Sequence, residues 1–188
     1  MSTTLIVVDV QNDFCEGGSL AVTGGNHVAE MLARLLDDAR GGYQYVIATR
    51  DHHIDPGAHF SETPDFVDSW PSHCVVGTPG QELHPAIAGF AFDAIFDKGS
   101  YEAAYSGFEG SIGGTNEGED LAEWLLEHEV THVDVVGLAT DYCVRATALD
   151  SATAGFPTRI LIDLTAPVHP DRLELVAEEL SEKGVGFA

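Results

Sequence analysis

The sequence predicts a single α/β domain over residues 1–188, built on a doubly wound, mostly parallel central sheet with helices on both faces. Two observations lead to this fold class. Short, nearly continuous apolar runs rich in β-branched residues recur along the chain, and segments with helical periodicity lie between them. Strand followed by helix, repeated along a chain, is typical of parallel sheets with right-handed crossovers.

Five short apolar segments have the character of buried parallel strands. They are residues 5–10, 45–49, 91–96, 132–137 and 158–162. Four segments with helical periodicity are residues 27–39, 120–127, 141–154 and 171–180. In the first of these, Val28, Leu32 and Leu36 recur every fourth residue and share one helical face. No repeat, linker or low-complexity tract divides the chain, so we expect one domain.

The chain is strongly acidic, with 8 Lys and Arg residues against 31 Asp and Glu residues and a net charge of −23. A field of this sign repels phosphate backbones and anionic lipids, so we expect neither nucleic acid nor a membrane as a partner. The N-terminal segment MSTTLIVVDV lacks the basic start and long apolar stretch of a signal peptide. We therefore expect a soluble cytoplasmic protein.

Four chemically reactive side chains fall at the ends of predicted strands. Asp9 closes the first strand and Asp51 follows the second. Lys98 lies two residues beyond the third, and Cys143 lies at the start of the helix after the fourth. Ligands of doubly wound sheets bind beyond the carboxyl ends of the strands, near the point where strand order reverses. We therefore expect these four groups on one edge of the sheet.

Cys143 is the strongest candidate nucleophile among the three cysteines. The segment GLATDYCVRAT places it in the first turn of a helix, where backbone amides and the helix dipole stabilise a thiolate. The alternative is a small buried hydrophobic residue, which is the usual role of a lone cysteine. The chain has three cysteines, Cys143 together with Cys15 and Cys74. An odd number at such wide spacing argues against a disulfide framework or a CxxC metal site.

Asp9 and Lys98 each have an ordinary structural explanation, as a strand-end carboxylate and as a surface lysine. However, the chain has only two lysines, Lys98 and Lys183, and one of them falls at a strand end beside a candidate thiol. A carboxylate can take the proton of Cys143 and later protonate a leaving amine, while an ammonium stabilises the thiolate. The three residues together form a usable catalytic set.

A second group of polar residues suggests a metal site. Asp51 and His53 are two apart in an extended segment and project to the same side, whereas His52 points the other way. A turn returns the chain to His59, and the segment WPSH introduces His73. One carboxylate and three imidazoles could hold a divalent metal; the alternative is a histidine-rich solvated loop. An ordered metal site would explain the long connection of residues 51–80, which has few helix or strand signals.

Three aromatic residues near this edge either pack in the core or sandwich a flat ring. They are Phe14, Trp70 and Tyr105. No chemistry is assigned to the remaining histidines on predicted helices, helix entries and strand edges, which are His27, His84, His128, His132 and His169.

Four long stretches, taken in order over nearly the whole chain, contain all these polar groups. They are VDVQNDFCEGGSLAV, TRDHHIDPGAHFSETPDFVDSWPSHCVVGTPG, FDKGSYEAAYSGFEG and VVGLATDYCVRATALDSA. These stretches resemble the nicotinamidases, also called pyrazinamidases, of the isochorismatase-like hydrolase superfamily. The resemblance implies an isochorismatase-like fold, which is Rossmann-like with three layers. Matches of this length are far more specific than any single short motif.

Position by position, the resemblance implies a catalytic triad of Asp9, Lys98 and Cys143. It implies an oxyanion hole made by the amides of Ala139 and Cys143, after a cis peptide bond between Leu138 and Ala139. The matching metal ligands are Asp51, His53, His59 and His73. The matching substrate-binding residues are Phe14, Trp70, Tyr105, Leu138 and Ala139. The chain departs from the family pattern at two positions, Tyr142 and His52.

The resemblance also implies an activity: nicotinamide is converted to nicotinic acid and ammonia through a thioester acyl-enzyme. The expected cofactor is one divalent ion, iron, manganese or zinc, which binds the substrate ring nitrogen. Pyrazinamide is an expected second substrate, and NAD salvage is the expected role. We expect the protein to be a monomer or a homo-oligomer. One alternative is a related hydrolase of a ureido compound, a linear amide or isochorismate. Another is a metal-binding or storage module without catalysis.

Overall fold

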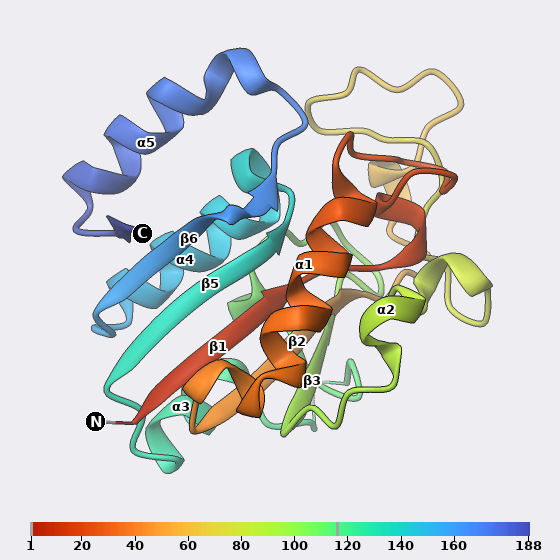
Figure 1. Ribbon diagram of the computed structural model, residues 1–188. Coiled ribbons are helices and arrows are strands. Elements are labelled where there is room, and N and C mark those ends of the chain that lie inside the picture. The colour runs from red at the N-terminus through yellow and green to blue at the C-terminus, as the bar shows by residue number, and fades with distance from the viewer. Residues whose placement is uncertain (1, 116) are drawn as a thin grey trace.

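The computed structural model describes residues 2–115 and 117–188, and a seven-stranded sheet runs through the centre of this part (Figure 1). The strand order is β4-β3-β2-β1-β5-β6-β7, and of these strands β4 alone runs antiparallel to its neighbour. The predicted mostly parallel sheet is confirmed. The strands are β1 (Thr3–Val8), β2 (Tyr45–Asp51), β3 (Ala94–Lys98), β4 (Ser111–Ile112), β5 (His132–Leu138), β6 (Thr158–Ala166) and β7 (Gly186–Phe187).

Helices cover both faces of the sheet, as predicted (Figure 1). One face carries α1 (Gly25–Asp37) and α2 (Pro85–Ala88). The other carries α3 (Leu121–Glu127), α4 (Arg145–Thr153) and α5 (Leu173–Glu182). Within the described residues, no helix combines the length and apolar character needed to cross a membrane.

The alternation of side chains along β1 creates two separate cores. Leu5 packs in one buried cluster with Leu32 of α1. Its neighbour Ile6 packs in the other cluster with Ala148 of α4. Because both faces of β1 are covered, its sequence is a nearly continuous apolar run.

The start of α1 is held by a side chain from outside the helix. The Glu16 carboxylate accepts hydrogen bonds from the amides of Gly24 at 2.6 Å and Asn26 at 2.7 Å, satisfying donors that the first helical turn leaves free. The hydrogen bonds from the amides of Asn26 and Gly24 lower the pKa of Glu16. The loop that precedes α1, and carries Phe14, is thereby tied to the helix.

The predicted elements match the long strands and helices, with differences at their ends. The third strand begins at Ala94, not at residue 91, because Phe92 donates its amide to the Phe90 carbonyl at 3.2 Å in a tight turn. The predicted helix 141–154 begins with a wider, π-helical turn over Thr140–Val144. The edge strands β4 and β7 were not predicted, since two residues are too short to show a period.

A glycine is required where strand β5 pairs with β1 near the carboxyl ends of both strands. Gly137 of β5 has φ +111°, and a Cβ atom at this position would collide with the backbone oxygen of Val8. Glycine is therefore needed here for its conformation and for its lack of a side chain. Strand β1 lies between β2 and β5, so the order of connection reverses between β1 and β5.

The long connection after β2 is ordered without long helices or strands. Its backbone pairs with itself twice, at His53 with Val75 and at Phe60 with Trp70. Asp65 fixes the turn between them, because one of its carboxylate oxygens accepts hydrogen bonds from three amides of residues 67–69. The segment therefore has a defined path above the sheet edge.

The excess of carboxylates predicts that salt stabilises the fold. Raising KCl from about 0.01 M to about 0.15 M shortens the range of charge interactions from roughly 30 Å to roughly 8 Å, which weakens self-repulsion at a net charge of −23. We expect the Tm measured by circular dichroism to rise by several degrees over this range. NaCl should give the same shift, and a Tm that stays constant or falls would contradict this expectation.

Candidate active site

Four reactive side chains meet at the carboxyl ends of the central strands. Asp51 and Lys98 are the last residues of β2 and β3, Asp9 directly follows β1, and Cys143 lies five residues after β5. Because β1 and β5 are neighbours, Asp9 and Cys143 flank the point where strand order reverses. The structure therefore brings together the four groups that the sequence placed on one edge.

Lys98 is the centre of this group, and its side chain is completely shielded from solvent. Its Nζ lies 3.0 Å from Asp9 Oδ2 and 3.8 Å from Cys143 Sγ, and it donates a hydrogen bond to Asp51 Oδ1. It also donates to the carbonyl of Ala104 at 3.2 Å. The ammonium is thus held by two carboxylates and a carbonyl, at a distance from which it can stabilise charge on the sulfur.

Burial and charge compete in setting the pKa values of these groups. Burial disfavours a charged Lys98, but the two carboxylates outweigh it and raise the pKa of Lys98 well above its ordinary value. Burial likewise opposes ionisation of Asp51, yet Lys98 and the two neighbouring histidines hold the pKa of Asp51 well below its usual range. At Asp9 burial prevails over Lys98 and raises the pKa.

Burial also prevails at Cys143 and raises the pKa of its thiol well above the ordinary value, although Lys98 opposes this. This direction opposes the thiolate that its place in a helical turn suggested. The reason is that the side chain is almost fully desolvated, which outweighs the helix end and the ammonium. A neutral thiol needs a base, and the Asp9 carboxylate lies against the same Lys98 ammonium as the sulfur.

The turn between β5 and α4 shapes the surroundings of the sulfur. The Leu138–Ala139 peptide bond is cis, as the family resemblance implied. The Ala139 carbonyl accepts hydrogen bonds from the amides of Tyr142 and Val144, both at 3.1 Å, whereas its own amide has no hydrogen-bond partner among the described residues. Ala139 and Cys143 both line the pocket described below. Their expected role as an oxyanion hole stays a prediction.

A cluster of three buried histidines lies beside the Lys98 network. His53, His59 and His73 each offer a ring nitrogen, and these atoms lie within 4.8 Å of one another. Asp51 Oδ2 lies 3.4 Å from Nε2 of His53 and 3.5 Å from Nε2 of His73. Asp51 thus turns one oxygen to Lys98 and the other to the histidines. The structure brings together the four residues of the predicted metal site.

The state of the histidine rings fits a divalent cation. The Nδ1–H groups of His53 and His73 donate to backbone carbonyls at 2.6 Å and 2.7 Å, which leaves each Nε2 with a free lone pair. His53 Nε2 and His59 Nδ1 are buried without a hydrogen bond in the part of the chain that the structure describes. Burial, with the neighbouring histidines, lowers the pKa of His59 to about 4, so that its ring is neutral at neutral pH. Neutral imidazoles and a carboxylate are the donors that such ions prefer.

A buried glutamine that the sequence did not single out holds Asp51 in place. Gln11 donates to the Asp51 carbonyl at 2.9 Å and accepts from the Asp51 amide at 2.8 Å, as a neighbouring strand would. His52 points away from the cluster, as predicted, and its Nδ1 lies 3.7 Å from Asp97. The backbone position of Asp51 is therefore determined by Gln11 as well as by the sheet.

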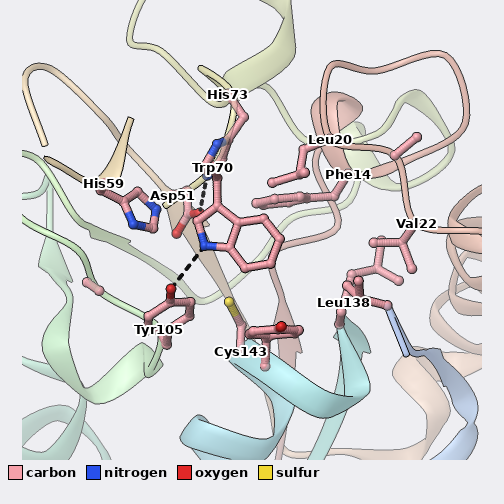
Figure 2. Close-up of a pocket in the computed structure, with 15 residues that line it drawn as sticks. Phe14, Leu20, Val22, Asp51, His59, Trp70, His73, Tyr105, Leu138 and Cys143 are labelled. Carbon is pink, nitrogen blue, oxygen red and sulfur yellow. Dashed lines mark hydrogen bonds and ion pairs between the residues drawn. The ribbon is translucent and has the colours of Figure 1, made fainter. Parts of the chain in front are cut away.

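A mostly apolar pocket of about 540 Å³, counting its open mouth, lies above the sulfur. Figure 2 shows the indole of Trp70 above Cys143, with Tyr105 on one side and Phe14 on the other. The Trp70 indole N–H donates to the Tyr105 hydroxyl at 3.1 Å, which fixes both rings. Every predicted substrate-binding residue lines this pocket: Phe14, Trp70, Tyr105, Leu138 and Ala139.

The sequence did not identify several residues of the pocket wall. They are Leu20, Ala21, Val22, Ala104, Tyr142 and Val168. Of these residues, Tyr142 alone was noted in the sequence, because it departs from the family pattern. In the structure its ring stands edge-on to Trp70, with ring centroids 5.2 Å apart. Cys15 and Cys74 are buried and do not line the pocket. Of the candidate thiols, Cys143 is therefore the one that faces it.

Comparison with known proteins gives a consistent result. The family model for the isochorismatase domain matches residues 3–186. The chain is 53% identical to nicotinamidase/pyrazinamidase of Mycobacterium tuberculosis, covering 96% of this chain and 95% of that protein. Pyrazinamidase of Pyrococcus horikoshii in complex with zinc superposes with a TM-score of 0.80 at 35% identity, over 100% and 99% of the two chains. Yeast nicotinamidase bound to the inhibitor nicotinaldehyde gives 0.85 at 30% identity, over 99% of each chain.

Proposed function

This chain belongs to the isochorismatase family, and we propose that it is a nicotinamidase that converts nicotinamide to nicotinic acid and ammonia and also hydrolyses pyrazinamide. One observation carries the proposal. Cys143, with Asp9 and Lys98 behind it, faces the same apolar pocket as two histidines of the buried cluster. A flat aromatic carboxamide fits this combination, because its ring contacts apolar walls while its amide carbon lies against the thiol.

In the first half of the reaction, Asp9 acts as the base. It accepts the proton of Cys143 as the sulfur attacks the carboxamide carbon, and its raised pKa suits it to this step. Lys98 stabilises the negative charge on the sulfur while the proton moves. The amides of Ala139 and Cys143 donate to the oxyanion, a contact worth ~3 kcal/mol per donor.

In the second half, Asp9 returns the proton to the amide nitrogen, and ammonia leaves. The acid portion remains on Cys143 as a thioester. Asp9 is again a base and takes a proton from water as the water attacks the thioester carbon. The sulfur then leaves, recovers the proton from Asp9, and the carboxylic acid product is released.

We assign four residues as ligands of one divalent ion, which is iron, manganese or zinc: Asp51, His53, His59 and His73. When bound, the ion supplies a Lewis-acidic position for the ring nitrogen of the substrate. The ring itself is held by Phe14, Trp70, Tyr105 and Leu138, which leave it little freedom to rotate. This orientation places the carboxamide between the sulfur and the Ala139 amide.

We further propose that the protein folds as a single domain and acts in the cytoplasm in NAD salvage. Its three cysteines are free and buried, which suits a reducing compartment. For the oligomeric state we propose a monomer or a homo-oligomer, since a single chain supplies Cys143 and the histidine cluster.

Purified protein is expected to release ammonia from nicotinamide, to lose this activity on chelation, and to regain it with iron, manganese or zinc. The reason is that the substrate ring is oriented by the ion and the walls together. A coupled ammonia assay with each ion restored separately measures this. If nicotinamide is not turned over with any ion while a ureido compound or a linear amide is cleaved, the nicotinamidase proposal fails. The protein would then be a cysteine hydrolase of different specificity.

Cys143→Ala is expected to reduce turnover by at least about 10⁴-fold, because the remaining residues cannot form a covalent intermediate. Its metal content should equal that of the wild type, as elemental analysis would show. Cys15→Ala is the matched control: its thiol is buried away from the pocket, so turnover should be retained. Activity near the wild-type level in Cys143→Ala would exclude it as the nucleophile.

His53→Ala is expected to lose the bound ion and to raise KM, because it removes one of the converging nitrogens. Elemental analysis after dialysis measures the first effect, and steady-state kinetics the second. His132→Ala changes an exposed histidine at the start of β5 and should alter neither. Full metal occupancy in His53→Ala would contradict the assigned ligand set.

A further inference from the structure

Thr49 is a buried residue of β2 that the mechanism above does not use. Its carbonyl accepts a hydrogen bond from the Asp9 amide at 3.2 Å, and its hydroxyl donates to Asp9 Oδ1 at 2.6 Å. Both residues are 0% exposed. One residue therefore holds the backbone and the carboxylate of the proposed base.

The two carboxylate oxygens of Asp9 have different surroundings. Oδ1 accepts the Thr49 hydroxyl. Within the described residues Oδ2 accepts no side-chain hydroxyl, and it lies 3.0 Å from Lys98 Nζ, with which it forms a buried ion pair. The Cys143 sulfur lies 3.8 Å from the same ammonium. Oδ2 is therefore the oxygen of Asp9 that shares the Lys98 ammonium with the Cys143 sulfur.

One local feature orients the Thr49 hydroxyl, and a second explains why Asp9 needs the contacts of Thr49. The Thr49 methyl group lies close to Gly107, where an added Cβ would be 2.7 Å from it, so the side chain is confined to one rotamer. Asp9 has φ +49°, a conformation that few residues other than glycine adopt and that persists only where the surroundings enforce it. The contacts of Thr49 supply part of that enforcement.

We propose that Thr49 is a positioning residue for the hydrolysis: its hydroxyl occupies Asp9 Oδ1 and thereby presents Oδ2 to the Cys143 thiol. The inference rests on the proposed function and specifies its first step. In that step the Sγ–H bond breaks as an Oδ2–H bond forms, and Thr49 keeps its own proton. The same oxygen then gives the proton to the leaving nitrogen and accepts the next proton from water.

Removal of the hydroxyl separates this role from a merely structural one. Thr49→Val keeps the shape of the side chain but leaves Oδ1 unpaired, so the carboxylate is free to rotate. We expect kcat to fall by about tenfold to a hundredfold, which is the effect of a small misplacement of a reacting group. KM and metal content should stay near wild type, because Thr49 does not line the pocket. Thr49→Ser restores the donor and should recover most of kcat.

The matched control is Thr158→Val in β6. Thr158 is buried, and its hydroxyl donates to the Phe156 carbonyl at 2.8 Å and lies 2.7 Å from the Ser151 hydroxyl, away from the pocket. This variant loses a comparable buried hydrogen bond, and its Tm should fall while kcat is unchanged. If Thr49→Val fails to fold, Thr49→Ala lacks the same donor and carries the same expectations.

The rate at which iodoacetamide alkylates Cys143, followed by peptide mass analysis, is a second readout that needs no substrate. It should fall in Thr49→Val and recover in Thr49→Ser. If the wild type does not hydrolyse nicotinamide, the proposed function fails, while the alkylation rates still test the role of Thr49. Wild-type kcat and alkylation in Thr49→Val would overturn the inference, as would equal losses of kcat in Thr158→Val.

Discussion

The buried charge of Lys98 is the interaction on which the rest of the site depends. An ammonium without solvent contact costs several kcal/mol to desolvate, and it stays charged here because Asp9 and Asp51 lie on either side of it. The two carboxylates need the ammonium equally, since each is buried as well. Loss of Lys98 would leave two buried carboxylates without a counter-charge. The arrangement that performs the chemistry is therefore also a requirement of folding.

The same charge gives two like carboxylates opposite roles. Asp51 directs one oxygen to Lys98 and the other to two histidines, and its lowered pKa suits the anionic ligand that we propose. Asp9 lies deeper and has a raised pKa, which suits a group that accepts and returns protons. Environment and not residue type separates the ligand from the base. Lys98 lies beside both carboxylates and connects Asp51 of the histidine cluster to Asp9 and Cys143.

Much of this could be predicted from the sequence because a parallel sheet brings the carboxyl ends of its strands to one edge, so that strand-end residues such as Lys98 must meet. The raised pKa of Cys143 could not be predicted, since it depends on how completely other segments of the chain cover the sulfur. The pocket wall at Val168 comes from the turn after β6, and no periodicity encodes its approach. In the sequence Thr49 is an ordinary strand residue, and its hydrogen bond to Asp9 becomes visible only in the structure.

The backbone near the switch point determines how the ends of β1 and β5, which carry Asp9 and lead to Cys143, lie side by side. Glycine at position 137 lets β5 press against the backbone of β1, which brings the ends of these strands close together. One residue beyond β1, Asp9 has a positive φ that costs on the order of 1–3 kcal/mol. The contacts of Asp9 with Lys98 and Thr49 offset this cost. The strain therefore persists because the groups that the reaction needs are the ones that hold it.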